Sequence, residues 1–314
     1  MTEKKNNFKK EVIPVCLMGF LFIIIYSFVL FLTKPFTSEG GIQQAFEDIN
    51  NPVNIVMIIL IMLVLTLVIL IIAKYWKDKI IQIIILFSVG YTSFYAFFLP
   101  IFNIIFPTFP DIVLIFSLIL AILLVIALYK YPEWYVIDIS GIIIGIGAII
   151  IFGISLGILL VLILLIALAL YDAISVYKTK HMIDLADTVM DLKLPVLLVI
   201  PKKRGYSLLK ETKRLKEKLK GDEEREAFFM GLGDIVIPGI LVAAVYHQIN
   251  TPEGILIAIG IIIGILIGFT ILMTFVLKGK PQAGLPCLCG GAIIGYIVSS
   301  FILFGELKGL VSIF

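Results

Sequence analysis

Nine apolar segments, each near the length of a membrane-spanning helix, restrict the fold of this 314-residue chain more than any other feature. A helix needs about 20 apolar residues to cross the hydrocarbon core of a bilayer. The segments do not alternate apolar and polar residues, as strands of a membrane barrel would. We therefore expect an all-α, polytopic membrane protein with nine transmembrane helices, at 12–33, 53–73, 80–105, 111–129, 136–153, 156–177, 227–247, 254–277 and 284–304.

The distribution of basic residues orients these helices. Of the 25 Lys and Arg residues, 23 lie in segments that nine spans place on one side: 1–11, 74–79, 130–135, 178–226 and 278–281. Cytoplasmic loops carry the excess of Lys and Arg in membrane proteins. The N-terminus is therefore expected to be cytoplasmic and the C-terminus external. This divides the chain into an N-terminal six-helix bundle (1–177), a cytoplasmic loop (178–226) and a C-terminal three-helix part (227–314).

Two aspartates interrupt the apolar segments on either side of the long loop. A charge at the centre of a membrane helix costs roughly 2.5–3.5 kcal/mol on insertion scales. Asp172 lies six residues before Lys178, and Asp234 lies eight residues after Glu226. At about 1.5 Å per residue, both lie roughly 9–12 Å below the cytoplasmic face. On consecutive antiparallel helices, the two carboxylates can face each other and share one proton.

Such a pair can hydrolyse a peptide bond. The ionised carboxylate takes a proton from water, and the protonated carboxyl donates to the oxygen of the scissile carbonyl. Gly231 and Gly233 leave room for a substrate backbone beside Asp234. Pro238 has no N–H, so the carbonyl of Asp234 loses its helical partner. A buried pair that only positions two helices remains an alternative.

Three motifs resemble those of the presenilin and signal peptide peptidase family of intramembrane aspartyl proteases. Tyr171-Asp172 resembles the YD motif, and Gly231-Leu232-Gly233-Asp234 resembles GxGD. The segment 282–286 is similar to the third motif, Pro-Ala-Leu, although only Leu285 matches it in place. The resemblance covers the whole nine-helix plan. The chain looks most like archaeal presenilin homologues, which share stretches such as 131–138 and 171–177.

The resemblance implies an intramembrane-cleaving aspartyl protease with Asp172 and Asp234 as its catalytic pair. The inside N-terminus matches presenilins and implies transmembrane polypeptide substrates of type I-like orientation. The resemblance implies no cofactor, no metal and no accessory subunit. It allows a homo-oligomer, and it implies a location in the plasma membrane of an archaeal or other prokaryotic cell. The residues expected to bind substrate are Tyr171, Gly231, Gly233, Ala283, Gly284 and Leu285.

Other interpretations of the same residues stay open. A channel or transporter could use the two aspartates for ions or protons, although no internal repeat is visible. Residues 153–157 fit GxSxG, and His247 is the only histidine in reach of Ser155, but a turn of small residues explains this segment better. The HExxH motif of zinc proteases and any signature of nucleic-acid binding are absent from the sequence.

Three features lie near the predicted cytoplasmic face. Asp138 is expected at the level of the lipid headgroups, either solvated or paired with a lysine. Residues 194–201 form a proline-bounded, β-branched run, which predicts a strand whose edge pairs with an extended substrate. The rest of the loop 178–226, including helical spacing at Lys210–Lys220, is expected to lie on anionic headgroups.

Overall fold

The computed structural model describes residues 2–75, 78–176, 197–202, 206–207, 227–277 and 282–309. Most of the predicted cytoplasmic loop, with the Lys210–Lys220 segment, lies outside these described residues. The helices before the loop are α1 (Thr2–Ser38), α2 (Val53–Tyr75), α3 (Asp78–Ser93), a π-helical turn η1 (Phe94–Phe98), α4 (Leu99–Ile105), α5 (Pro110–Lys130), α6 (Trp134–Ser155) and α7 (Ile158–Ile174). After it come β1 (Leu197–Pro201), β2 (Ala227–Gly231), α10 (Gly233–Gln248), α11 (Pro252–Val276) and α12 (Gly284–Phe304).

Membrane-length helices dominate the described part of the chain. Six are long and apolar enough to cross a bilayer, and the segments Val53–Leu65, Ile158–Ile174 and Gly233–Gln248 are shorter apolar helices. Together they occupy the nine predicted positions. The predicted helix 80–105 is divided into α3, η1 and α4, because Pro100 in the first turn of α4 cannot continue a regular helical ladder. The π-helical turn immediately before this proline takes up the irregularity.

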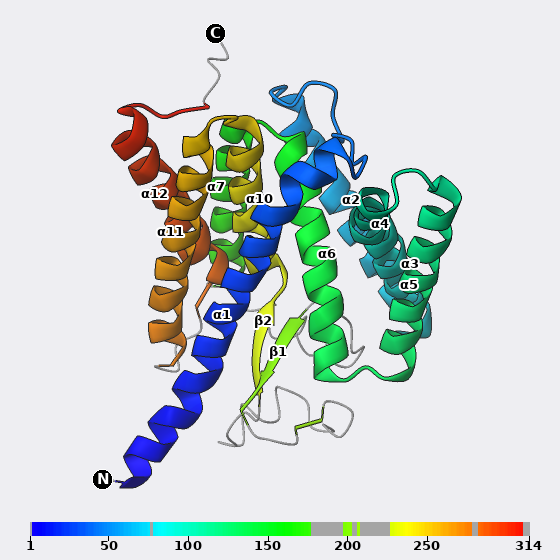
Figure 1. The fold of residues 1–314 in the computed structure, drawn as a ribbon. Coiled ribbons are helices and arrows are strands. Elements are labelled where there is room, and N and C mark those ends of the chain that lie inside the picture. Colours follow the sequence, from blue (N-terminus) through cyan, green and yellow to red (C-terminus); the bar gives the residue numbers. More distant parts are fainter. Residues whose placement is uncertain are drawn as a thin grey trace.

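The helix α10 lies at the centre of the molecule. Figure 1 shows α1 crossing α10 and α11 obliquely, with α6 beside them and α3, α4 and α5 on the far side of α6. Residues Pro238–Val245 of α10 are all buried. A helix that is apolar and buried on all sides belongs to the core of a large bundle. Because the core cluster includes residues from α1, α6, α7, α10, α11 and α12, the parts before and after the loop pack as one body.

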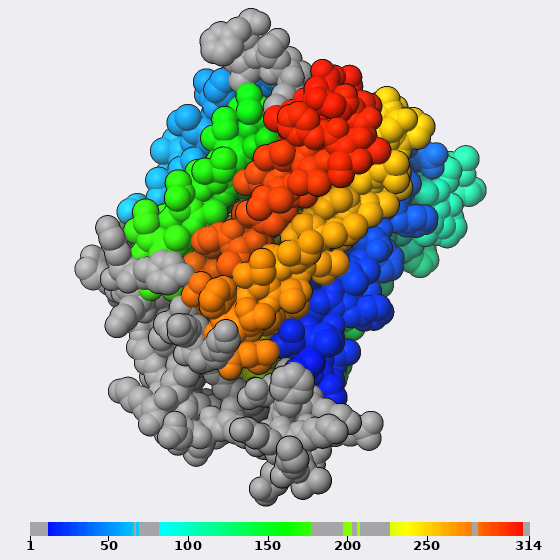
Figure 2. Space-filling view, turned by 90° about the vertical axis from the view of Figure 1, so that its left-hand side faces the viewer, coloured from blue at the N-terminus to red at the C-terminus, as the bar shows by residue number. Residues whose placement is uncertain are grey.

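The helices α11 and α12 approach each other through glycines. A Cβ added at Gly264 would collide with the carbonyl of Gly291, and one at Gly260 would lie 2.6 Å from the Cβ of Ser299. Small residues at such positions allow membrane helices to pack backbone against backbone. Figure 2 shows α12 between α7 and α11 on one face of the molecule, with α1 beyond α11. This packing fixes the first turn of α12, which reaches the site described below.

A short hairpin replaces the predicted start of the helix at 227–247. Residues 227–231 are strand β2, which pairs antiparallel with β1 and places Val199 opposite Phe229. The prediction of a continuous helix from 227 was therefore wrong. Phe228 and Phe229 favour a strand, and glycines at 231 and 233 are poor helix formers. The prediction of a strand at 194–201 is confirmed for Leu197–Pro201.

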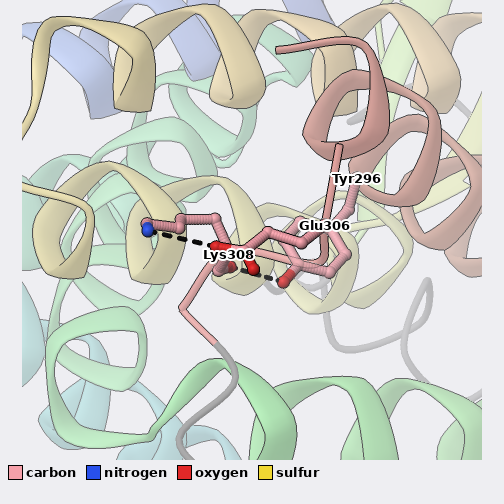
Figure 3. Close-up of polar contacts among 3 residues, drawn as sticks. All are labelled: Tyr296, Glu306 and Lys308. Atoms are coloured by element: carbon pink, nitrogen blue, oxygen red, sulfur yellow. Dashed lines mark hydrogen bonds and ion pairs between the residues drawn. The ribbon is translucent and has the colours of Figure 1, made fainter. Parts of the chain in front are cut away.

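The chain after α12 folds back on the bundle at the end opposite the hairpin. Figure 3 shows the hydroxyl of Tyr296 donating to the carbonyl oxygen of Lys308 at 2.7 Å, and Lys308 Nζ lies 3.3 Å from Glu306 Oε1. Gly305 ends α12 in the left-handed conformation, which a glycine adopts without steric cost. The start of α1 and the end of α12 thus lie at opposite ends of the molecule (Figure 1).

Candidate active site

The first carboxylate, Asp172, lies near the end of α7 and meets the first turn of α12. Its side chain is only 5% exposed. The backbone N–H of Leu285 donates to Asp172 Oδ2 at 3.1 Å, and the N–H of Gly284 is directed at the same carboxylate. The first N–H groups of a helix lack intrahelical partners and carry partial positive charge. The start of α12 therefore supplies the N–H donors and the positive charge that stabilise a buried carboxylate.

The second carboxylate, Asp234, lies in the first turn of α10. The sequence predicted it inside a helix, where a charge is costly. Because the chain arrives as strand β2 and α10 begins only at Gly233, Asp234 is instead at a helix N-terminus, where the helix dipole favours negative charge. Its side chain is half-buried. Both carboxylates are thus placed against helix N-termini, Asp172 against α12 and Asp234 within α10.

Gly284 connects the two carboxylates. Its N–H is directed at Asp172, while a Cβ built on it would lie 3.0 Å from Oδ2 and 3.2 Å from Oδ1 of Asp234. Any side chain at position 284 would press on the carboxylate of Asp234. The glycine that departs from Pro-Ala-Leu therefore stands where even a methyl group would contact the carboxylate of Asp234.

The other residues expected to bind substrate are placed differently. A Cβ at Gly231 would lie 3.4 Å from Asp234 Oδ2, so this residue borders the same carboxylate. Gly233 is exposed, and a Cβ there would meet only Ile237, at 4.0 Å. Ala283, which precedes α12, is 1% exposed. Tyr171 is 70% exposed. The structure thus brings the glycines and the start of α12 together around the aspartates, and leaves the side chain of Tyr171 on the outer surface of α7.

Tyr26 of α1 borders the site without having been expected there. Its side chain is fully buried, and its hydroxyl donates to the carbonyl oxygen of Ile235 at 2.9 Å. Ile235 follows Asp234, and Pro238 interrupts the helical hydrogen bonds just beyond it. The hydroxyl supports the backbone at the point where the helix is weakest. A single tyrosine in an apolar helix carries no sequence signal for this role.

Two polar side chains at opposite ends of α6, Asp138 and Ser155, are both buried. Asp138 is neither solvated nor at a free surface. It is 7% exposed, and its Oδ1 accepts the backbone N–H of Val199 at 2.8 Å. Ser155 is also buried: its hydroxyl donates to Ile151 O at 2.6 Å and accepts the N–H of Ala45 at 2.8 Å. Its hydroxyl thus links the last turn of α6 to the loop after α1.

The geometry supports acid and base chemistry. Two carboxylates share one small region, one almost fully buried and one half-buried beside the exposed Gly233. A region open on one side admits water and an extended chain, while the two carboxyl groups supply a base and an acid. In the described residues, no group of three or more His, Cys, Asp and Glu side chains is arranged to hold a metal ion.

Comparison with known proteins gives a consistent result. The family model described as signal-peptide peptidase, presenilin aspartyl protease matches residues 19–305. A solved structure of a presenilin family intramembrane aspartate protease in space group C222 is 31% identical, with a TM-score of 0.64, and the match covers 92% of this chain and 98% of that one. A structure described in the same words in space group P2 is 32% identical, also with a TM-score of 0.64, and the match covers 91% and 96%. No curated protein sequence matches the chain.

Proposed function

Because this chain belongs to the signal-peptide peptidase and presenilin family and is an intramembrane-cleaving aspartic endopeptidase, we propose that Asp172 and Asp234 are its catalytic pair. The observation that carries this proposal is that both carboxylates face Gly284. The family assignment does not favour the alternative of a channel or transporter that uses the same aspartates.

The pair acts with one shared proton. The ionised carboxylate accepts a proton from a water molecule, whose oxygen attacks the scissile carbonyl carbon, while the protonated carboxyl donates to the carbonyl oxygen. Collapse of the tetrahedral intermediate breaks the C–N bond, and the leaving nitrogen takes a proton from the pair. The roles belong to the two carboxyls as a unit, because strongly interacting groups titrate together.

The substrate binds as an extended strand at the edge of β2. The strand β1 was expected to offer this edge, but its Val199 N–H is directed at Asp138, away from β2. Val199 and Phe229 are therefore a pair whose backbone groups point outward, so Phe229 presents its N–H and carbonyl on the outer edge of β2. An added strand would run towards Gly231, beside Asp234. Gly233 and the segment Ala283–Leu285 then flank the scissile bond, and Tyr171 contacts the substrate helix before it unwinds.

The full proposal includes membrane topology and substrates. The nine apolar helices span the membrane, with a cytoplasmic N-terminus and an external C-terminus, in the plasma membrane of an archaeal or other prokaryotic cell. Opposite positions of the start of α1 and the end of α12 support this topology (Figure 1). The substrates are transmembrane polypeptides of type I-like orientation, taken from the lipid bilayer without an accessory subunit. This proposal is compatible with a homo-oligomer.

A cleavage assay tests the catalytic pair. The full chain is reconstituted in lipid vesicles with a fluorescent single-span substrate, and wild type is compared with Asp172→Asn and Asp234→Asn. Each substitution is expected to lower kcat by at least about 100-fold, because a shared proton requires both carboxyls. Asp111→Asn, at an exposed aspartate of α5, is the control and should cleave normally. Full cleavage by either site variant would overturn the proposal.

Two further measurements refine the proposal. The dependence of kcat/KM on pH should be bell-shaped, because the pair must hold one proton and not two or none. The same substrate inserted in the reverse orientation should be cleaved more slowly. Equal rates for both orientations would remove the proposal of type I-like substrates while leaving the catalytic pair intact.

A further inference from the structure

One face of α6 contacts the segments on either side of Asp234, namely the two strands before it and the helix α10 after it. Asp138, Gly145, Ile149 and Gly153 are spaced by seven, four and four residues, which places them on one side of a helix. A Cβ at Gly145 would lie 3.3 Å from the side chain of Leu232, directly before α10. Further along α6, Ile149 contacts α10 at Gly239, and Gly153 lies against α10 at Ala243. The contacts of this face therefore run along α10 from its start.

Asp138 is the member of this face that meets a strand. Where α6 faces the helix α10, small or apolar residues suffice, because a helix satisfies its own backbone groups. The edge of a strand instead presents unpaired N–H groups. The N–H of Val199 is such a group, and the carboxylate of Asp138 accepts it at 2.8 Å in a buried environment. The polar side chain therefore stands where the neighbouring backbone needs an acceptor.

The β1–β2 pair connects the hydrogen bond between Asp138 and Val199 to the site. Val199 is opposite Phe229, and two residues later β2 ends at Gly231, which borders Asp234. Phe229 also packs against an apolar cluster that includes Ile137, the neighbour of Asp138 in α6. Between Asp138 and the catalytic aspartate there is thus a continuous series of backbone and side-chain contacts.

A second hydrogen bond attaches the chain after β1 to the same helix. The hydroxyl of Ser207 donates to Glu133 Oε1 at 2.7 Å, one residue before α6 begins. Tyr206 packs against the same apolar cluster as Phe229. The start of α6 therefore contacts β1, β2 and the segment that follows β1. Two short strands are only marginally stable in isolation. These contacts with α6 therefore fix the orientation of the β1–β2 pair.

We propose that Asp138 is a positioning residue for proteolysis. Its carboxylate fixes the edge of β1, and through the register with β2 it sets the position of Gly231 and of a bound substrate strand relative to Asp234. It also closes the β1 edge, so that a substrate can add only to β2. This inference rests on the proposed catalytic pair and on strand addition, and it assigns Asp138 no contact with the reacting atoms.

Substitutions that keep or remove the acceptor test this role. Asp138→Asn retains an acceptor oxygen, whereas Asp138→Leu has similar size and none. The matched control is Ser140→Ala, because Ser140 is also buried in α6 but its hydroxyl donates to Val136 O within the same helix. For each purified full-length variant, kcat, KM, the Tm and the cleavage positions, identified by mass spectrometry, are measured with one single-span substrate.

The expected result separates positioning from folding. Asp138→Leu should lower kcat by about 10-fold or more, since small displacements of a bound group have large effects on rate, and should shift the cleavage positions. Asp138→Asn should stay within about 3-fold of wild type with unchanged products, because it keeps the acceptor. Ser140→Ala should match wild type. Wild-type kcat and products for Asp138→Leu would overturn the proposal, as would a loss that only follows the folded fraction.

Val199→Pro provides an independent test from the other side of the hydrogen bond. It removes the donor while leaving Asp138 in place, and proline is tolerated where the strand N–H points away from its partner strand. It should reproduce the shifted products of Asp138→Leu, and the double variant should be no worse than either single one. Additive losses would refute a shared role. If Asp234→Asn abolishes cleavage while these variants cleave normally, only the positioning role fails, and the catalytic pair stands.

Discussion

A single methyl group at position 291 should weaken both the fold and the site. Gly291 of α12 faces α11, and a Cβ there would lie 2.9 Å from the carbonyl carbon of Gly264 and closer still to its oxygen. The neighbouring Gly290 has no atom within 4 Å of such a carbon. The pair Gly291→Ala and Gly290→Ala therefore compares the same chemical change on the same helix, with and without a collision.

The magnitude follows from two opposing terms. Replacing glycine by alanine in a helix favours folding by about 0.8–1.0 kcal/mol at either position. Overpacking a close contact costs typically about 1–3 kcal/mol, and only position 291 bears this cost. The free energy of unfolding of Gly291→Ala should therefore lie about 1–3 kcal/mol below that of Gly290→Ala. Comparing the two variants cancels the helix propensity.

The same collision should reach the proposed catalytic pair. Leu285 lies six residues before Gly291, about 9 Å along α12, and its N–H holds Asp172 at 3.1 Å. Separating the two helices on the order of 1 Å would break this hydrogen bond, and a displacement of this size can cost about 100-fold in rate. The assay is thermal unfolding in detergent together with kcat in vesicles. Equal stability and equal kcat for the two variants would refute the proposed close packing.

Three further substitutions give definite expectations. Tyr26→Phe removes the hydroxyl that donates to Ile235 O. The free energy of unfolding should therefore fall by about 0.5–1.5 kcal/mol, and kcat should fall too, as measured by thermal unfolding and cleavage. Gly284→Val brings a branched side chain against Asp234 and should lower kcat by at least about 100-fold with little change in Tm; near-normal cleavage would contradict the close approach. Ser155→Ala should keep its kcat while its Tm falls, because the hydroxyl has structural partners only; loss of cleavage in the folded variant would revive the serine mechanism.

The spans and the two aspartates are the part of this protein that its sequence determines. Apolar runs of membrane length are a local property, and so is a carboxylate inside one, because each has a cost that the chain must offset wherever it folds. The sequence therefore predicts the helix positions, Asp172, Asp234 and the family motifs. It also predicts a strand in the loop, from β-branched residues between prolines.

Tertiary structure decided how these parts meet. Asp172 reaches Leu285 across 113 residues, Tyr26 reaches Ile235 across 209, and Asp138 reaches Val199 across 61. No local pattern specifies such partners. The position of Asp234 within its helix also depends on tertiary contacts. Residues 227–231, the predicted first turn of its helix, pair with β1 as strand β2, and this leaves Asp234 at a helix N-terminus. A hydrogen-bond donor in a buried backbone must find an acceptor, and only the assembled fold determines which side chain provides it.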